Sequence, residues 1–484
     1  MSADILHFIN GQSRPSADGS TFGTSEPATG RPLATVALGG AADVDAAVSA
    51  AAAAGERDDW RRLPPAERAR LLRNLADIVR GEAESIAVTE ARDSGHPIED
   101  ARADVAICAE ILEYYSTLPE NIRGTTYAEQ PGFLTTSRRE PYGVVAAIAP
   151  WNFPFFFAVT KTGPALATGN TVVLKMAEQT PLTAVMFGEL CHRAGFPPGV
   201  VNIVNGDAKT GAALVAHPGI SKITFTGSTE VGTAIQRAGV NCHLELGGKT
   251  ANIVTAHADL ETAARASVHQ AFFNAGQVCT AGSRLLLAEE IADEFLEMFL
   301  RATEDVVVGD PLNSATQMGS LVSHEHRDSV ERAIATAVAE GASIAIGGRR
   351  LAQQPEGAFL EPTVLDGVTP AMAAAQQEIF GPVVSVLRYR DLDEAVRIAN
   401  GTAYGLAATV WSTRLDEAIE LTDRLEAGIV WTNAPFRDHA HVPYEGHKAS
   451  GRGEEGGLET IREFTKLKVN YLAHRAQPSP WGTP

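Results

Sequence analysis

The sequence lacks the features that define disulfide-rich, zinc-binding and secreted proteins. Only four of its 484 residues are cysteine, and Cys108, Cys191, Cys242 and Cys279 lie far apart, with no CxxC pair. This spacing predicts neither a disulfide framework nor a metal site. The opening segment MSADILHFING has no basic stretch and no apolar stretch, so no signal peptide is expected. Together these absences favour a reducing, cytoplasmic setting.

Long apolar runs and basic patches are also missing. The most apolar stretch, residues 144–159, is interrupted by Pro150, Asn152 and Pro154, which makes it unsuited to span a bilayer. Lys and Arg number 40 against 59 Asp and Glu, for a net charge of −19. A protein that binds a phosphate backbone needs a basic surface. We therefore expect neither a membrane nor a nucleic acid as a partner.

What the chain does have is ample apolar material, at 44% of residues, in a repeating α/β order. Between residues 143 and 246, short apolar runs flanked by Gly, Pro or Asn alternate with helical segments, and a second alternation starts near residue 250. This order predicts the α/β class, with two parallel sheets covered by helices. Residues 122–142 read as a hairpin, and residues 465–471 alternate like a strand that could pair with it.

Two loops carry residues suited to catalysis. Asn152 stands between two prolines after a predicted strand, where a rigid amide could donate to an oxyanion. Its alternative role is to cap the next helix. Cys279 lies on a loop between Gly276 and Gly282, where backbone N–H groups can favour the thiolate that nucleophilic catalysis needs. The alternative is an inert buried cysteine.

A carboxylate follows at the end of another predicted strand. Glu245 lies next to Gly247 and Gly248, and flexible backbone of this kind lets a substrate approach closely. Glu245 could therefore act as a general base, or it could be a structural carboxylate.

Two further strand ends have features of a nucleotide site. Lys175 and Glu178 are three residues apart and could contact the hydroxyls of a ribose, or they could form a solvated ion pair. Gly227 and Ser228 end a strand and open a helix, whose free N–H groups can face a pyrophosphate. The GxGxxG fingerprint is absent there, so a plain capped turn is the alternative.

The five segments occur in an order that resembles the NAD(P)-dependent aldehyde dehydrogenase superfamily from about Phe8 to Tyr471. Later segments agree with this resemblance, namely EIFGPV at 378–383, Asn400 with YGL at 404–406, and KASG at 448–451. The resemblance implies the aldehyde dehydrogenase fold, with two Rossmann-like α/β domains and a small β oligomerisation element. Residues 1–121 and 143–246 would form the NAD-binding domain and 247–447 the catalytic domain. Residues 122–142 and 463–477 would form the oligomerisation hairpin and tail strand of a homodimer or homotetramer.

The resemblance also implies a mechanism. Cys279 would attack the aldehyde carbon, and Asn152 with the backbone N–H of Cys279 would hold the oxyanion of the thiohemiacetal. Hydride transfer would leave a thioester, and Glu245 would activate water to release a carboxylic acid. Relatives that transfer the acyl group to coenzyme A usually lack this Glu, so its presence favours hydrolysis. An acylating relative and a catalytically silent homologue remain the alternatives.

For the cofactor, the resemblance implies NAD, with NADP as the less favoured alternative. Glu178 would accept the ribose hydroxyl and repel a 2′-phosphate. The residues implied to bind the cofactor are Trp151, Lys175, Glu178, Gly227, Ser228, Leu246, Glu378 and Phe380.

The implied substrate pocket is apolar and partly aromatic, which suits a medium-sized apolar or aromatic aldehyde. Its members would be Phe153, Phe156, Phe157, Val278, Thr280, Trp431 and Arg437. A semialdehyde held by Arg437, or an amino-aldehyde against the aromatic rings, remains open. The chain departs from the family near its C-terminus, where PFGG is frequent and Pro443-Tyr444-Glu445-Gly446 stands here after a His-rich segment. A metal at His439 and His441 is not expected, because no third ligand is suitably spaced.

Overall fold

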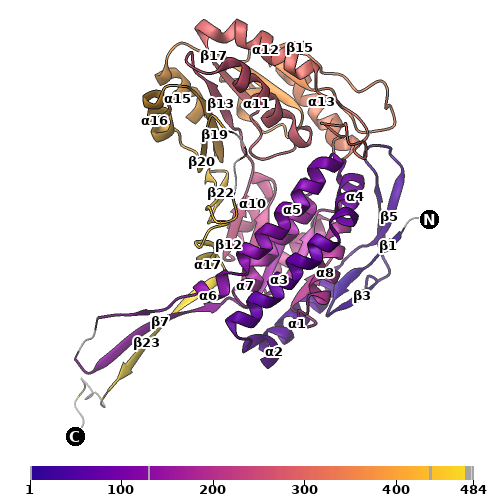
Figure 1. Cartoon of the computed structure of the whole chain (residues 1–484). Coiled ribbons are helices and arrows are strands. Elements are labelled where there is room, and N and C mark those ends of the chain that lie inside the picture. Colours follow the sequence, from indigo (N-terminus) through magenta and orange to yellow (C-terminus); the bar gives the residue numbers. More distant parts are fainter. Residues whose placement is uncertain (1–2, 129–130, 435, 437–438, 475–480, 482–484) are drawn as a thin grey trace.

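Two α/β units and a long β arm make up the computed structural model (Figure 1). The structure describes residues 3–128, 131–434, 436, 439–474 and 481. Each unit has one large sheet with apolar cores against it: the first sheet takes its strands from residues 7–245 and 451–452, and the second from residues 251–432. The arm, which contains the predicted hairpin, projects away from both units. The two units confirm the predicted α/β class.

The first unit holds an eight-stranded sheet in the order β22-β12-β11-β8-β9-β10-β2-β3. Its five central strands are parallel, as the sequence predicts, while both edges are antiparallel. The strands are β2 (His7–Ile9), β3 (Gln12–Arg14), β8 (Val144–Ala149), β9 (Thr171–Met176), β10 (Val201–Ile203), β11 (Lys222–Thr226), β12 (Cys242–Glu245) and β22 (Gly451–Arg452).

Helices cover both faces of this sheet because alternate side chains of each strand point to opposite faces. Along β8, Val145 and Ala147 join the core beneath α3, α5, α7 and α8, whereas Val144 and Ala146 join the core beneath α1, α9 and α10. The helices are α1 (Ala41–Glu56), α2 (Asp58–Arg61), α3 (Pro65–Gly81), α4 (Ala83–Ser94), α5 (Ile98–Tyr115), α6 (Leu118–Asn121), α7 (Pro154–Ala167), α8 (Leu182–Arg193), α9 (Ala208–Ala216) and α10 (Thr229–Arg237).

The second unit is a seven-stranded sheet in the order β15-β16-β17-β14-β13-β19-β20, parallel except for β15. Its strands are β13 (Ala251–Val254), β14 (Arg284–Ala288), β15 (Ser343–Ile346), β16 (Thr363–Asp366), β17 (Val383–Tyr389), β19 (Ala407–Trp411) and β20 (Ile429–Thr432). Its helices are α11 (Leu260–Phe272), η1 (Phe273–Gly276), η2 (Glu289–Ile291), α12 (Ala292–Glu304), α13 (His324–Ala339), α14 (Ala373–Gln376), α15 (Leu392–Asn400) and α16 (Leu415–Arg424).

The arm confirms the expected pairing between the hairpin and the tail. Strand β23 (Thr465–Ala473) pairs antiparallel with β7 (Phe133–Pro141) along its whole length, and β6 (Thr125–Thr126) lies on the other side of β7. The remaining elements are β1 (Ala3–Ile5), β4 (Thr21–Ser25) and β5 (Pro32–Ala37), which form a small sheet, and β18 (Tyr404–Gly405), β21 (His447–Lys448) and α17 (Thr460–Glu463).

The helical stretch that begins at Ile98 is broken shortly before Leu118. The chain leaves helix α5 at Tyr115, and a short helix begins again at Leu118. Pro119 explains the break, because proline has no N–H to donate and is favoured in a first helical turn. Within the described residues, no helix combines the length and apolar character that crossing a bilayer requires.

Candidate active site

The loops that carry Asn152 and Cys279 are joined by reciprocal hydrogen bonds. The Asn152 Nδ2 donates to the Gln277 carbonyl at 2.8 Å, and the Asn274 Nδ2 donates to the Asn152 carbonyl at 2.8 Å. Asn152 does not cap helix α7, whose N-cap position is taken by Phe153 without a side-chain hydrogen bond. The amide keeps a second N–H that can serve an oxyanion near Cys279.

The Cys279 loop owes its shape to left-handed backbone. Asn274 and Ala275 have φ values of 48° and 54° inside η1, and Gly276 follows at 68°. A Cβ on Gly276 would lie 2.2 Å from the Gly381 carbonyl oxygen, so only glycine fits there. This turn carries the chain from α11 to a half-buried Cys279 beside the carboxyl end of the first sheet.

Glu245 ends β12, where it is buried in a cluster of ionisable groups with His243, Lys161 and the partly exposed Glu455. His243 Nε2 lies 3.4 Å from Glu245 Oε1, and the Lys161 ammonium contacts Glu455 Oε2 at 2.5 Å. Neither Glu245 oxygen has a hydrogen-bond partner among the described residues. Burial raises the pKa of Glu245 well above its usual range, although the positive charge of Lys161 opposes this and Glu455 adds to it.

The neighbouring histidine is neutral. Burial, together with the charges of Lys161 and Lys222, lowers the pKa of His243 well below its usual value. Its Nδ1 lies 3.1 Å from Thr224 Oγ1. Ligand atoms of His243, Glu245 and Glu455 lie within 4.8 Å of one another, a spacing that could admit a metal ion. The Lys161 ammonium already contacts Glu455, and its charge repels a cation from that place.

The glycine pair after Glu245 brings Glu378 and the Cys279 loop together. Gly248 N–H donates to Glu378 Oε1 at 2.8 Å, and a Cβ on Gly247 would lie 2.4 Å from Glu378 Oε2. A Cβ on Gly248 would lie 2.2 Å from the Cys279 carbonyl oxygen. Burial raises the pKa of Glu378 to about 7, although the Gly248 bond opposes it. Side chains at either glycine would therefore push these groups apart.

The strand ends of the first sheet gather the predicted ribose and pyrophosphate residues. Lys175 is buried and its Nζ lies 3.5 Å from Glu178 Oε2, whose side chain is 40% exposed. Burial lowers the pKa of Lys175, and Glu178 opposes that shift. Ser228 accepts from Val231 N–H at 3.3 Å, which confirms it as the cap of α10.

The start of helix α10 is packed closely against the predicted cofactor residue Leu246. A Cβ on Gly232 would lie 2.3 Å from Leu246 Cδ2, and Gly227 N–H donates to the Glu245 carbonyl at 3.0 Å. A helix N-terminus at the carboxyl edge of a parallel sheet is the expected place for an anionic cofactor. The residues at this edge therefore fit a dinucleotide.

Trp151 and Phe380 face each other across the two units. Their ring centroids are 5.3 Å apart at 86°, and His326 contacts both rings. His326 Nε2 donates to the Phe380 carbonyl at 2.7 Å, and burial lowers the pKa of this histidine. Phe380 has a φ of 57°, a left-handed conformation that this bond helps to hold.

The predicted pocket aromatics form one cluster. Phe153 contacts the rings of Phe156 and Phe157 at 6.4 Å each and stacks on Phe273 at 6.0 Å. Phe436 links this group to Trp431. Phe273 and Phe436 are missing from the predicted set. Phe273 could have been found from its place in the Phe272-Phe273-Asn274 run before Cys279.

Two other predicted pocket residues flank Cys279 in the chain. Val278 is half-buried beside Cys279, and Thr280 is buried on its other side. Arg437 lies outside the described residues. His439 and His441 stack at 5.5 Å, and His441 contacts the Tyr114 ring.

The sequence analysis did not identify four further residues next to the site as functional groups. These are His243, Lys161, Glu455 and Tyr444, and Tyr444 Oη lies 3.7 Å from Cys279 Sγ. His243 could have been found, since it is two residues before Glu245 on a strand and so shares its face.

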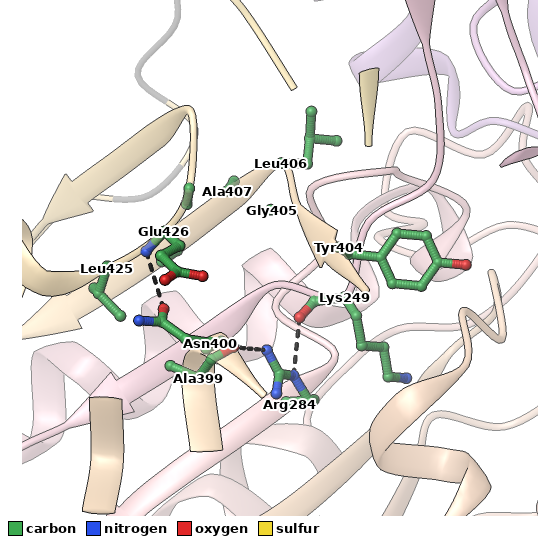
Figure 2. A pocket seen from close by; sticks show the side chains of 13 residues that line it. Lys249, Arg284, Ala399, Asn400, Tyr404, Gly405, Leu406, Ala407, Leu425 and Glu426 are labelled. Atoms are coloured by element: carbon green, nitrogen blue, oxygen red, sulfur yellow. Dashed lines mark hydrogen bonds between the residues drawn. The ribbon is translucent and has the colours of Figure 1, made fainter. Parts of the chain in front are cut away.

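A separate cavity of about 20 Å³ is lined by Lys249 and Arg284, among others (Figure 2). The buried Arg284 guanidinium donates to the carbonyls of Lys249, Ile398 and Ala399 at 2.8–2.9 Å. A cavity of that size holds about one water molecule. The Arg284 guanidinium supports the Lys249 backbone, and the cavity is too small for a nucleotide.

Known proteins are similar to this chain over nearly its whole length. A family model described as "Aldehyde dehydrogenase family" matches residues 14–470. Hydroxyisobutyraldehyde dehydrogenase of Mycolicibacterium austroafricanum is 42% identical over 480 residues, or 98% of this chain and 94% of that protein. Retinaldehyde dehydrogenase 3 of Homo sapiens is 42% identical over 96% of this chain and 91% of its own length. A crystal structure of indole-3-acetaldehyde dehydrogenase in complex with NAD+ is similar with a TM-score of 0.95 and 40% identity, covering 98% of this chain and 97% of that one.

Proposed function

The chain belongs to the aldehyde dehydrogenase family, and from that premise we propose that it oxidises an apolar or aromatic aldehyde to a carboxylic acid with NAD. The observation that carries this proposal is the pair of hydrogen bonds that join the Asn152 loop to the Cys279 loop. An oxyanion donor and a nucleophile are held together there, with Glu245 at the adjoining strand end.

In this proposal the Cys279 thiolate attacks the aldehyde carbon, and the electron pair of the C=O bond moves to the oxygen. Asn152 Nδ2 and the Cys279 backbone N–H stabilise the resulting oxyanion. When held at the strand ends beside Lys175, Glu178 and Ser228, NAD would supply the acceptor for the hydride of that carbon. The acyl group remains on Cys279 as a thioester, and water attacks it while Glu245 takes the water proton. The C–S bond breaks, the carboxylic acid leaves and the thiolate returns.

The buried cluster around Glu245 supports its role as the base. Its raised pKa means that the carboxylate gains a proton readily. The charges of the Lys161–Glu455 pair act on this carboxylate from the same cluster. A carboxylate with a raised pKa is a stronger base than an exposed one, which favours transfer of the water proton to it.

The aromatic cluster supports the substrate class. Phe153, Phe156 and Phe157 meet Phe273 and Phe436 near the cysteine loop, which favours an apolar or aromatic aldehyde. The related proteins carry names of varied aldehydes, from hydroxyisobutyraldehyde to retinaldehyde.

A panel of aldehydes tests the proposal. We expect NADH formation at 340 nm with apolar and aromatic aldehydes to exceed that with semialdehydes and amino-aldehydes by about tenfold or more in kcat/KM, because charged groups lose hydration against aromatic walls. Equal activity with a semialdehyde would contradict the substrate class. Activity that requires coenzyme A would reveal an acylating enzyme, and no turnover with any aldehyde would reveal a silent homologue.

NAD preference depends on Glu178 in this proposal. Its carboxylate lies 3.5 Å from Lys175, where it can accept a ribose hydroxyl and repel a 2′-phosphate. We expect Glu178→Ser to raise kcat/KM with NADP about tenfold relative to NAD. Glu189→Ser on the exposed face of α8 is the matched control. An unchanged NADP/NAD ratio in the Glu178 variant would refute this assignment.

The arm supports the proposal of a homodimer or homotetramer. Strand β23 forms the edge of its sheet, and Leu467, Val469 and Tyr471 are 55%, 42% and 72% exposed. An exposed apolar edge strand is a place where a second copy can pair. Static light scattering should give a multiple of the 51.2 kDa chain mass, and a single-chain mass would contradict this.

A further inference from the structure

Tyr444 lies on the segment between β20 and β21, and its backbone is held on both sides. Its N–H donates to the Glu455 carbonyl at 2.7 Å, and the Glu455 N–H donates back to the Tyr444 carbonyl at 2.9 Å. Pro443 precedes it and restricts the approach of the chain. The half-buried Tyr444 ring is therefore positioned by the same residue whose carboxylate contacts Lys161 in the cluster beside Glu245.

The hydroxyl of this ring reaches the nucleophile. Tyr444 Oη lies 3.7 Å from Cys279 Sγ, within hydrogen-bonding distance for the larger sulfur atom. A thiol can donate or accept, but a thiolate has no proton to donate. Once Cys279 is deprotonated, the phenol must be the donor of this contact. A phenylalanine at this position, as in the frequent PFGG form of the motif, would supply the ring without the donor.

We propose that Tyr444 is a catalytic residue of this chain, which donates its hydroxyl hydrogen bond to the Cys279 thiolate. This inference rests on the proposed role of Cys279 as nucleophile. The bond acts at two points of the cycle and transfers no proton at either. It stabilises the thiolate before attack, and it stabilises the sulfur again when the C–S bond of the thioester breaks and sulfur receives the electron pair.

The size of the effect follows from two opposing consequences. A charge-assisted hydrogen bond is worth about one pH unit of thiolate stability, which raises the thiolate fraction about tenfold at neutral pH. The more stable thiolate is also a weaker nucleophile by about threefold. The net gain is therefore about threefold in attack, with a separate gain in thioester cleavage, where the thiolate is the leaving group.

Alkylation of Cys279 tests this without any turnover. In the full-length protein without NAD, we expect Tyr444→Phe to raise the pH midpoint of iodoacetamide alkylation by about one unit. Alkylation at pH 7 should be about threefold slower. Mass spectrometry of the Cys279 peptide gives the rate, and Cys242 in the same digest is the internal reference. Tyr127→Phe removes a hydroxyl on the arm that donates to Ser137 Oγ, far from Cys279 in the chain, and should leave the midpoint unchanged.

The outcomes separate this inference from the proposed function. An unchanged midpoint in Tyr444→Phe would overturn the hydrogen bond to the thiolate, and a lowered midpoint would show that the thiol donates to tyrosine instead. Because the readout needs no aldehyde, an enzyme that gives no NADH would still show the shift. A melting temperature of Tyr444→Phe within about 2 °C of the wild type would show that packing is kept. If the melting temperature falls further, Tyr444→His, which keeps a donor, should restore the alkylation midpoint.

Discussion

Replacing Cys279 with alanine is expected to abolish NADH formation, with kcat lower by a factor of about 10⁴ or more. The proposed route has no other nucleophile, because Asn152 only stabilises the oxyanion and Glu245 acts on water. The assay is NADH absorbance at 340 nm with the aldehyde that the wild type uses best. Residual turnover near 1% would contradict the assignment of the nucleophile.

Cys242→Ala is the matched control for this result. Cys242 is also half-buried and begins the strand that ends at Glu245, so its replacement tests local disturbance without touching the proposed chemistry. Burial raises the pKa of Cys242, which makes it a poor thiolate. We expect at least half of the wild-type activity in this variant. NAD binding followed by thermal shift should persist in both variants, since neither cysteine is among the residues proposed to bind the cofactor.

The sequence predicted the strand ends well because the relevant signals are local. Asn152 follows β8 directly, Lys175 lies at the end of β9 and Glu245 ends β12. Parallel strands bring their carboxyl ends to one edge of the sheet, so order along the chain was enough to place these residues together. The helix caps follow the same logic, since Ser228 acts within three residues of its own position.

Contacts between distant segments could not be predicted in this way. The bond from Asn152 to the Gln277 carbonyl joins residues 125 apart, and nothing local to either loop determines it. The Phe273–Phe436 contact and the Tyr444–Cys279 contact likewise join segments that lie far apart in the chain.

Glu245→Gln should separate the two halves of the proposed reaction. The amide cannot take the water proton, so thioester hydrolysis should fall by about 10²–10⁴ while thioester formation continues. We therefore expect a burst of about one NADH per active site, followed by slow turnover, and an intact mass increased by the acyl group. Glu420→Gln on the exposed face of α16 is the matched control.

The pH dependence gives this variant a second, independent readout. Burial raises the pKa of Glu245, so the carboxyl holds its proton below that raised value and becomes a base only as the pH rises through it. Steady-state turnover of the wild type should therefore increase as the pH rises through the raised pKa of Glu245. The Gln variant should lose this rising limb of the pH profile. Hydroxylamine, which attacks a thioester without a protein base, should restore turnover in the variant and yield a hydroxamate. A variant that shows no burst, or whose turnover keeps the wild-type pH limb, would show that the base lies elsewhere.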